Sequence, residues 1–489
     1  MASPFLAGVR DVLAQAAVVY TGTEQDEVLR RALARLDEPL RVAIAGKVKA
    51  GKSTLLNALV GEELAPTDEG ECTRIVTWYR DGLTYRVTLH PLEGPSRQVP
   101  FVRDGGAIDV NLGGLEHGEV DRLEVEWPSS RLAHMTLIDT PGMGSLSADI
   151  SERAELFLVP ESEESQADAV LYLMRHLHRT DLDFLETFRD ERSGTPVNSV
   201  AVLSRADEVG VGRIDSLESA AKIAERCRND PRIRAVAQTV VPVAGLLAQS
   251  GATLREDEFR ALATIAAAPA DDVNRLLLSA DRFVNSTAPF LLTDIERQDL
   301  LDRFGVFGIR LSTMLLREGV ATTSSTLSAE LIARSGLTEL RRVLLHQFAD
   351  RSDLLKARSA LGTLEAVLEQ HPTSTSSSLS SRIEQITANA HEFAELRLLN
   401  DIRVGVVTGK PDEIAAMERL LGVKGPTTTD RLGIEPTDDA ARLRMALVSE
   451  LQRWQRKAEN PLSTPDLVTA ARTLVRTCEG LLAGLATPA

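Results

Sequence analysis

The stretch RVAIAGKVKAGKSTLLNAL, residues 41–59, decides the fold that we expect for this chain. It begins as an apolar strand, passes through a glycine loop and continues as an apolar helix. Gly46, Gly51, Lys52 and Ser53 match the pattern G-x-x-x-x-G-K-[ST], with a strand before it and a helix after it, as the pattern requires. Backbone N–H groups of such a loop surround a phosphate, and its lysine contacts the β- and γ-oxygens. The stretch therefore predicts a phosphate-binding loop in an α/β domain.

The whole loop is expected to contact a nucleotide. Its candidate binding residues are Gly46, Lys47, Val48, Lys49, Ala50, Gly51, Lys52, Ser53 and Thr54. Lys52 is the candidate catalytic cation, and the Ser53 hydroxyl is a candidate Mg²⁺ ligand. Lys47 is interpreted as mainly solvated, and Lys49 is considered below.

Three later segments select guanine. In LIDTPG, Asp139 ends a buried strand, where it can hold the Mg²⁺ shell through water, and the Gly142 N–H can sense the γ-phosphate. In VLSRAD, Asp207 can accept hydrogen bonds from guanine N1–H and the 2-amino group, which adenine lacks; Ser204 and Arg205 precede it. The candidates in VVPVAG are Val243, Ala244 and Gly245, with the Ala244 backbone meeting guanine O6. Together, in this order, the segments predict GTP as the substrate.

A threonine on a loop would complete the site. We choose Thr73 as a catalytic residue and Mg²⁺ ligand, because its hydroxyl can bind the metal while its carbonyl holds the attacking water. Thr67 and Thr77 are the alternatives, and Thr73 can also be an ordinary surface residue.

Apolar runs alternate with helical stretches between about residues 39 and 250, which predicts a mostly parallel sheet with flanking helices. The runs lie at 42–45, 75–79, 85–89, 135–138, 169–174, 199–203 and 239–243. The flanking regions read as helical. We expect helices at 1–38, a GTPase domain at 39–250, and a long helical bundle at 251–489 that the first helices join. The family resemblance given below implies that this bundle is an elongated neck and trunk. Leucines over 337–370 predict one helical rod about 50 Å long.

Composition narrows the functional class. The chain has 489 residues and a net charge of −16, which argues against a nucleic-acid partner. Its three cysteines show no metal-ligand spacing, and we interpret them as free thiols in a reducing cytosol. No segment has the roughly 20 apolar residues of a membrane-spanning helix, and the first residues lack a signal-peptide pattern. Any membrane contact is therefore expected to be peripheral.

With GKVKAGKST, Thr73, DTPG and SRAD in this order, the chain resembles the dynamin superfamily. Within it, the chain looks most like the bacterial dynamin-like proteins, in particular the isoniazid-induced dynamin-like proteins of mycobacteria. The resemblance implies Mg²⁺-dependent GTP hydrolysis, self-association through the nucleotide-bound head, and remodelling of a phospholipid membrane by fission or fusion. It also implies a cytoplasmic protein at the inner face of the plasma membrane, with a paralogous dynamin-like protein as a possible partner.

Three loop positions differ from this family. Val48 stands where eukaryotic dynamins carry a glutamine that helps to place the attacking water, so we expect slow turnover. Arg205 replaces the usual lysine, and its alkyl stem can still cover the purine. Lys49 stands where dynamins have a serine that helps to bind a monovalent cation; its ammonium can take that cation's place as a catalytic charge, or it can point into solvent.

The membrane-contacting tip has two candidates. Phe304 and Phe307 flank a glycine in an aromatic-poor chain and can form an inserting turn, or they can be buried at a helical corner. The segment 403–437 is the second candidate. The alternative function is a GTP-switched assembly or signalling factor whose helical bundle binds protein partners instead of lipid.

Overall fold

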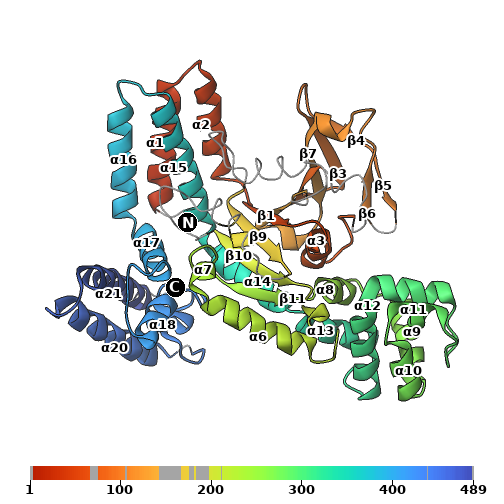
Figure 1. Cartoon of the computed structure of the whole chain (residues 1–489). Helices are drawn as coiled ribbons and strands as arrows, with labels where there is room; N and C mark the ends of the chain where they lie inside the picture. Colours follow the sequence, from red (N-terminus) through yellow and green to blue (C-terminus); the bar gives the residue numbers. More distant parts are fainter. Residues whose placement is uncertain are drawn as a thin grey trace.

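The computed structural model describes residues 4–66, 75–104, 107–141, 167–175, 181–182, 185, 198–210, 212–437 and 439–486. A sheet lies at the centre of the molecule (Figure 1). An upright group of helices stands at one side of the sheet, and a second group of helices lies at its opposite end (Figure 1). The two ends of the chain are both near the base of the upright group.

The sheet has nine strands in the order β11-β10-β9-β1-β8-β2-β7-β3-β4. Within it, β1 (Leu40–Gly46) pairs in parallel with β8 (Met135–Asp139) on one side and β9 (Ala169–Met174) on the other. The remaining strands are β10 (Ser199–Ser204), β11 (Val240–Val243), β2 (Val76–Asp81), β7 (Val120–Trp127), β3 (Arg86–Pro91) and β4 (Arg97–Val99). The expected α/β fold with a mostly parallel sheet is confirmed.

The sequence analysis missed the strands between residues 97 and 127. A small separate ribbon is formed by β5 (Phe101–Asp104) and β6 (Ala107–Val110), and β7 joins the main sheet with four carboxylate or guanidinium residues among its eight. These charged side chains hid the strand because they pair with one another across the sheet. Glu126, for example, accepts bonds from Arg80 (2.5 Å) and Arg86 of the neighbouring strands.

The sheet is buried on both faces, as parallel sheets are. Every residue of β9 and β10 is buried. Helices that pack beside these strands are α3 (Lys52–Val60), α6 (Ser216–Asn229), α7 (Pro231–Arg234) and α8 (Gly245–Ala252). The carboxyl ends of β1, β8, β10 and β11 therefore meet beside the start of α3.

The apolar core of the head does not stop near residue 250. Five further helices share one buried cluster with β9, β10 and α8. They are α9 (Glu256–Ala267), α10 (Ala270–Leu276), α11 (Ala280–Asn285), α12 (Asp294–Arg317) and α13 (Ser324–Arg334). They form the group at the end of the sheet in Figure 1.

The upright group contains α1 (Pro4–Val19), α2 (Glu24–Arg35), α15 (Ser352–Gln370) and α16 (Ser376–Asn389) (Figure 1). Their apolar faces belong to the same core as one face of the sheet. The first helices of the chain thus pack against helices more than 300 residues later.

The expected single rod over 337–370 is wrong. It is divided into α14 (Leu337–Gln347), a short turn at Ala349–Arg351, and α15. Phe348 is fully buried at the break, and Arg351 donates to the Leu421 carbonyl at 2.9 Å, which holds the turn away from a straight helical path. The leucine periodicity concealed the break because both halves bury a continuous apolar stripe.

The last part of the chain forms a compact helical unit. Its helices are α17 (His391–Arg403), α18 (Pro411–Leu420), α19 (Thr428–Leu432), α20 (Ala440–Glu459) and α21 (Pro465–Ala486). They have their own apolar cluster around Trp454 and Leu474. Within the described part of the chain, no helix is both long enough and apolar enough to cross a membrane.

Candidate nucleotide-binding site

The loop between β1 and α3 has the backbone geometry that its glycines predict. Gly46 has φ +147°, and a Cβ there would lie 2.6 Å from the Leu173 carbonyl oxygen. Gly51 has φ +91°. Lys49 has φ +62° although it is not glycine, a conformation that L residues seldom adopt. Glycine is therefore required at Gly46 by a close contact as well as by the backbone angle, and it is favoured at Gly51 by the backbone angle alone.

Lys52 lies at the centre of this loop. Its Nζ donates to the carbonyls of Gly46 at 3.3 Å and Lys47 at 3.5 Å, so the side chain reaches back from the start of α3 to the first residues of the loop. Burial lowers the pKa of Lys52, while the nearby Asp139 carboxylate raises it. A desolvated ammonium held by two weak bonds is well placed to exchange them for phosphate oxygens.

Ser53 and Asp139 converge at the start of α3. The Ser53 hydroxyl donates to Asp139 Oδ2 at 3.0 Å. Asp139 Oδ1 is buried and has no hydrogen-bond partner in the described residues. Burial raises the pKa of this carboxyl, against the opposing effects of Lys52 and Ser53. A hard cation fits here, since it favours oxygen ligands and would occupy the unpartnered oxygen.

The exposed crest of the loop is formed by Lys47, Val48 and Lys49. Lys47 is half-exposed and makes an ion pair at 2.9 Å with Asp181, which is buried. Asp181 also accepts from the Tyr172 hydroxyl at 2.8 Å. Lys47 is therefore more constrained than the expected solvated lysine.

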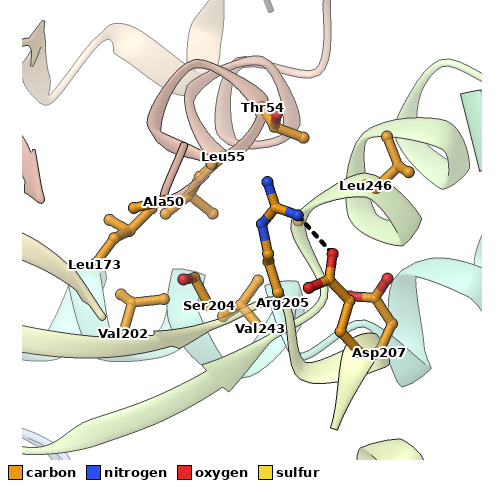
Figure 2. A pocket seen from close by; sticks show the side chains of 13 residues that line it. Ala50, Thr54, Leu55, Leu173, Val202, Ser204, Arg205, Asp207, Val243 and Leu246 are labelled. Carbon is orange, nitrogen blue, oxygen red and sulfur yellow. Dashed lines mark hydrogen bonds and ion pairs between the residues drawn. The ribbon is translucent and has the colours of Figure 1, made fainter. Parts of the chain in front are cut away.

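A pocket opens beside the loop, between α3, the end of β10 and the start of α8 (Figure 2). Arg205 stands across it, with its side chain extending from the end of β10 toward α3 (Figure 2). Its guanidinium donates to the Lys49 carbonyl at 3.0 Å and pairs with Glu208 at 2.6 Å. Arg205 thus lines the pocket, and Glu208 is a partner that the motif alone did not identify.

Asp207 is on the wall of the same pocket, as expected for a guanine-recognising carboxylate (Figure 2). Burial raises its pKa and Glu208 raises it further, while its own backbone and Arg205 oppose the shift. The pocket brings together eight of the residues that the sequence singled out. These are Ala50, Gly51, Thr54, Ser204, Arg205, Asp207, Val243 and Gly245.

The expected role of Ala244 is contradicted. Its side chain is fully buried, and its N–H donates to the Ser335 carbonyl at 2.9 Å, so that donor is unavailable to a guanine O6. Gly245 and Leu246 line the pocket at the first turn of α8, where backbone N–H groups have no helical acceptor. The sequence signal for Leu246 was the start of a helix directly after VVPVAG. The backbone N–H groups that lack a helical acceptor begin there, one or two residues after Ala244, to which we had assigned the contact with guanine O6.

The membrane role expected for Phe304 and Phe307 is also contradicted. They are 1% and 4% exposed and belong to the core beneath α8 and α9. Gly305 between them has φ +62° and kinks α12, which turns both rings inward. The two aromatic residues on either side of this glycine therefore belong to a buried kink in α12 and not to an exposed turn.

Three of the predicted threonine and glycine positions remain untested by geometry. Thr67, Thr73 and Gly142 lie outside the described residues. The alternative Thr77 is described: it is buried in β2, opposite Asp139 of β8, and its hydroxyl donates to the Ile75 carbonyl at 3.2 Å. Thr77 is therefore fixed in the sheet and does not serve as a loop threonine.

The comparison with known proteins decides the family. Residues 42–88 match the family model described as the dynamin family. The chain is 44% identical over 457 residues to the isoniazid-induced protein IniC of Mycobacterium tuberculosis, covering 93% of this chain and 92% of that protein. The chain belongs to the dynamin family. It is also 32% identical over 146 residues to the bacterial dynamin-like protein of Nostoc punctiforme, covering 28% of this chain and 20% of that protein.

A solved structure of an oligomerised bacterial dynamin pair aligns over 98% of this chain and 79% of its own, with 13% identity and a TM-score of 0.31. Dynamin family members are GTPases, and this chain is a GTPase. The suspected resemblance to the bacterial dynamin-like proteins is confirmed.

Proposed function

We propose that this dynamin-like GTPase binds GTP with Mg²⁺ at the β1–α3 loop and uses hydrolysis to move its helical part against a phospholipid surface. The observation that carries the proposal is a direct contact between α3 and the helix that leads into the upright group. Arg341 of α14 donates to the carbonyls of Ala58 at 2.8 Å and Leu59 at 3.4 Å, at the end of α3. Because α14 continues through the turn at 349–351 into α15, a displacement of the phosphate-binding helix has a short path to the upright helices.

At the site, each residue has a distinct task. Lys52 would exchange its two loop carbonyls for β- and γ-phosphate oxygens. Asp207 would accept from guanine N1–H and the 2-amino group, while the first N–H groups of α8 donate to O6. Ser53 and Asp139 would hold Mg²⁺, which supplies positive charge to the β- and γ-phosphates. Thr73 and Gly142 keep their predicted roles at the metal and at the γ-phosphate.

Lys49 is proposed as a charge beside the phosphates. Its left-handed backbone is held by the bond from Arg205 to the Lys49 carbonyl. Its ammonium would then replace the monovalent cation used elsewhere in the family. Because Val48 cannot hydrogen-bond through its side chain, we propose that turnover in solution is slow.

Lipid contact requires an exposed apolar surface, and among the exposed apolar side chains of the described residues we consider two turns of the helical part. In the connection that leads into α12, Leu291 is 97% exposed and Ile295 is 75% exposed. In the turn between α20 and α21, Leu462 is 93% exposed. We propose that the membrane is contacted peripherally through one of these turns, at the inner face of the plasma membrane, with self-association through nucleotide-bound heads or with a paralogous dynamin-like protein.

The test is co-sedimentation of the full chain with anionic liposomes, in the presence and absence of GTP. We expect sedimentation that depends on nucleotide and is lost in either Leu291→Asp or Leu462→Asp. Leu83→Asp is the matched control, because Leu83 is fully exposed on a turn of the head away from both candidates. If wild-type protein stays in the supernatant under every nucleotide condition, the alternative of a GTP-switched assembly factor with protein partners takes the place of this proposal.

A further inference from the structure

A second cavity lies near the start of strand β11, whereas the nucleotide pocket lies near the end of that strand. Its volume is about 490 Å³, within the range of small-molecule sites. Its walls come from the end of α6 and the approach to β11, from α14, and from the connection around α19. The cavity and the nucleotide pocket have no lining residue in common, so it is a separate site.

Two buried carboxamide side chains on its wall have polar atoms without a hydrogen-bond partner in the described residues. Gln238 is 8% exposed, and neither its Oε1 nor its Nε2 has a partner in the described residues. Gln347 is 4% exposed; its Nε2 donates to the Val423 carbonyl at 2.7 Å, but its Oε1 has no partner. Burying such a group unpaired costs about 1–3 kcal/mol each, so the wall is suited to a polar occupant.

The same wall has an excess of cations in a chain whose net charge is −16. Arg228, Arg342 and Lys424 face two carboxylates, Glu339 and Asp430. Arg228 pairs with Glu225 at 3.0 Å, and Arg342 donates a long bond of 3.4 Å to the Lys424 carbonyl. Glu339 lies 3.8 Å from Arg228 and 3.7 Å from Arg342, too far for hydrogen bonds. The Arg228 Nε is buried without a partner, and Asp430 accepts a 2.5 Å bond from the Thr427 hydroxyl. The guanidinium donors are therefore only partly satisfied by the protein.

We propose that this cavity binds a small phosphate monoester with a hydroxylated skeleton. The phosphate would accept from Arg228 and Arg342, with Lys424 adding charge, and hydroxyl groups would donate to the free oxygens of Gln238 and Gln347. Phosphate matches planar guanidinium donors, and hydroxyl donors match amide oxygens. A sugar phosphate and the glycerol phosphate of a lipid headgroup share this chemistry.

The site would join two parts of the molecule. Gln238 and Arg228 belong to the head, whereas Lys424 belongs to the last helical unit. A ligand held by both would resist their separation. The inference does not depend on the proposed membrane function, because it rests on a different cavity.

The test is isothermal titration of the full chain kept saturated with GDP and Mg²⁺, so that the nucleotide pocket is filled. The titrants are ribose 5-phosphate, glycerol 3-phosphate and inorganic phosphate. We expect one of the two organic phosphates to bind at least tenfold more tightly than inorganic phosphate, and the better one identifies the source. Gln238→Leu and Arg342→Ala should each weaken it about tenfold, whereas Arg334→Ala, on the exposed side of α13, should not.

Arg342 is half-exposed, so its truncation tests the site without disturbing the core even if Gln238→Leu fails to fold. The proposal is overturned if neither organic phosphate binds at millimolar concentration. It is equally overturned if binding is indifferent to Arg342→Ala, or if inorganic phosphate binds as well as both esters.

Discussion

Replacing Arg341 by alanine would remove the contact that joins α14 to the end of the phosphate-binding helix. The guanidinium donates at 2.8 Å to the Ala58 carbonyl and at 3.4 Å to the Leu59 carbonyl, both in the last turn of α3. Such carbonyls have no partner within the helix, so Arg341 satisfies them and also offsets the negative end of the helix. Burial, together with the neighbouring Arg131, lowers the pKa of Arg341 to about 10.

The magnitude follows from these contacts. A hydrogen bond from a charged donor contributes about 1.5–3 kcal/mol, and the second, longer bond adds little. Relief of the desolvation of Arg341 and of its repulsion by Arg131 offsets part of the loss. We therefore expect a net loss of about 2 kcal/mol for Arg341→Ala, and a smaller loss for Arg341→Lys, which keeps the charge but not the forked geometry.

Differential scanning fluorimetry with bound GDP measures this effect. For a domain of about 150–250 residues, a loss of about 2 kcal/mol corresponds to a fall in Tm of roughly 4–8 °C. The control is Arg334→Ala, since Arg334 is exposed on α13 and pairs with Glu330 of its own helix. A Tm for Arg341→Ala that equals that of the control would refute the reasoning, because the bonds to α3 would then contribute nothing.

Three further predictions concern the nucleotide site. Gly46→Ala should lower GDP affinity at least a hundredfold, because its Cβ would lie 2.6 Å from the Leu173 carbonyl; Gly362→Ala, where nothing lies within 4 Å, should bind normally in the same fluorescence titration. Asp207 must be ionised to accept hydrogen bonds from guanine, and its pKa in the folded protein is raised, so the preference for GDP over ADP should fall as the pH is lowered through that pKa. The Asp207→Asn variant should show a weak preference that does not change with pH. Equal pH profiles for the wild type and this variant would contradict the prediction. Lys49→Ala should slow GTP turnover about tenfold and make it respond to K⁺, whereas wild-type turnover should not change when K⁺ replaces a large organic cation.

The sequence predicted the parts of the site that depend on single-residue chemistry. Gly46 and Gly51 have backbone angles that favour glycine, Ser53 and Asp139 are brought together at the end of β8 and the start of α3, and Asp207 follows the end of β10 on the wall of the adjoining pocket. Such positions are recognisable because local geometry and chemistry coincide in a few consecutive residues.

The errors arose where a distant segment determined the outcome. Ala244 could not be assigned correctly, because its N–H is taken by Ser335, about 90 positions later in the chain. Phe304 and Phe307 are buried because α8 and α9 cover them, and the rod over 337–370 is broken where Arg351 reaches the Leu421 carbonyl. Periodicity records which face of a helix is apolar, but not which element will cover that face.

The joint between the head and the upright helices has two sides that are held differently. On one side, Asp168 at the base of β9 accepts from the Arg35 guanidinium of α2 at 2.7 Å and from the Arg41 N–H of β1 at 2.9 Å. That side is tied to the centre of the sheet. On the other side, α15 continues from α14, which is tied through Arg341 to α3.

A displacement of α3 relative to the sheet would therefore reach α15 before it reaches α2. Lys356 of α15 donates to the Leu36 carbonyl at 2.9 Å and to the Glu38 carbonyl at 3.1 Å, so the two sides meet at the link between α2 and β1. If α2 and α15 moved by different amounts, the whole upright group would tilt, because the close-packed core that these helices share resists sliding of one helix past another. Under the proposed function, this arrangement would convert a small movement at the phosphates into a larger one at the far end of the helices.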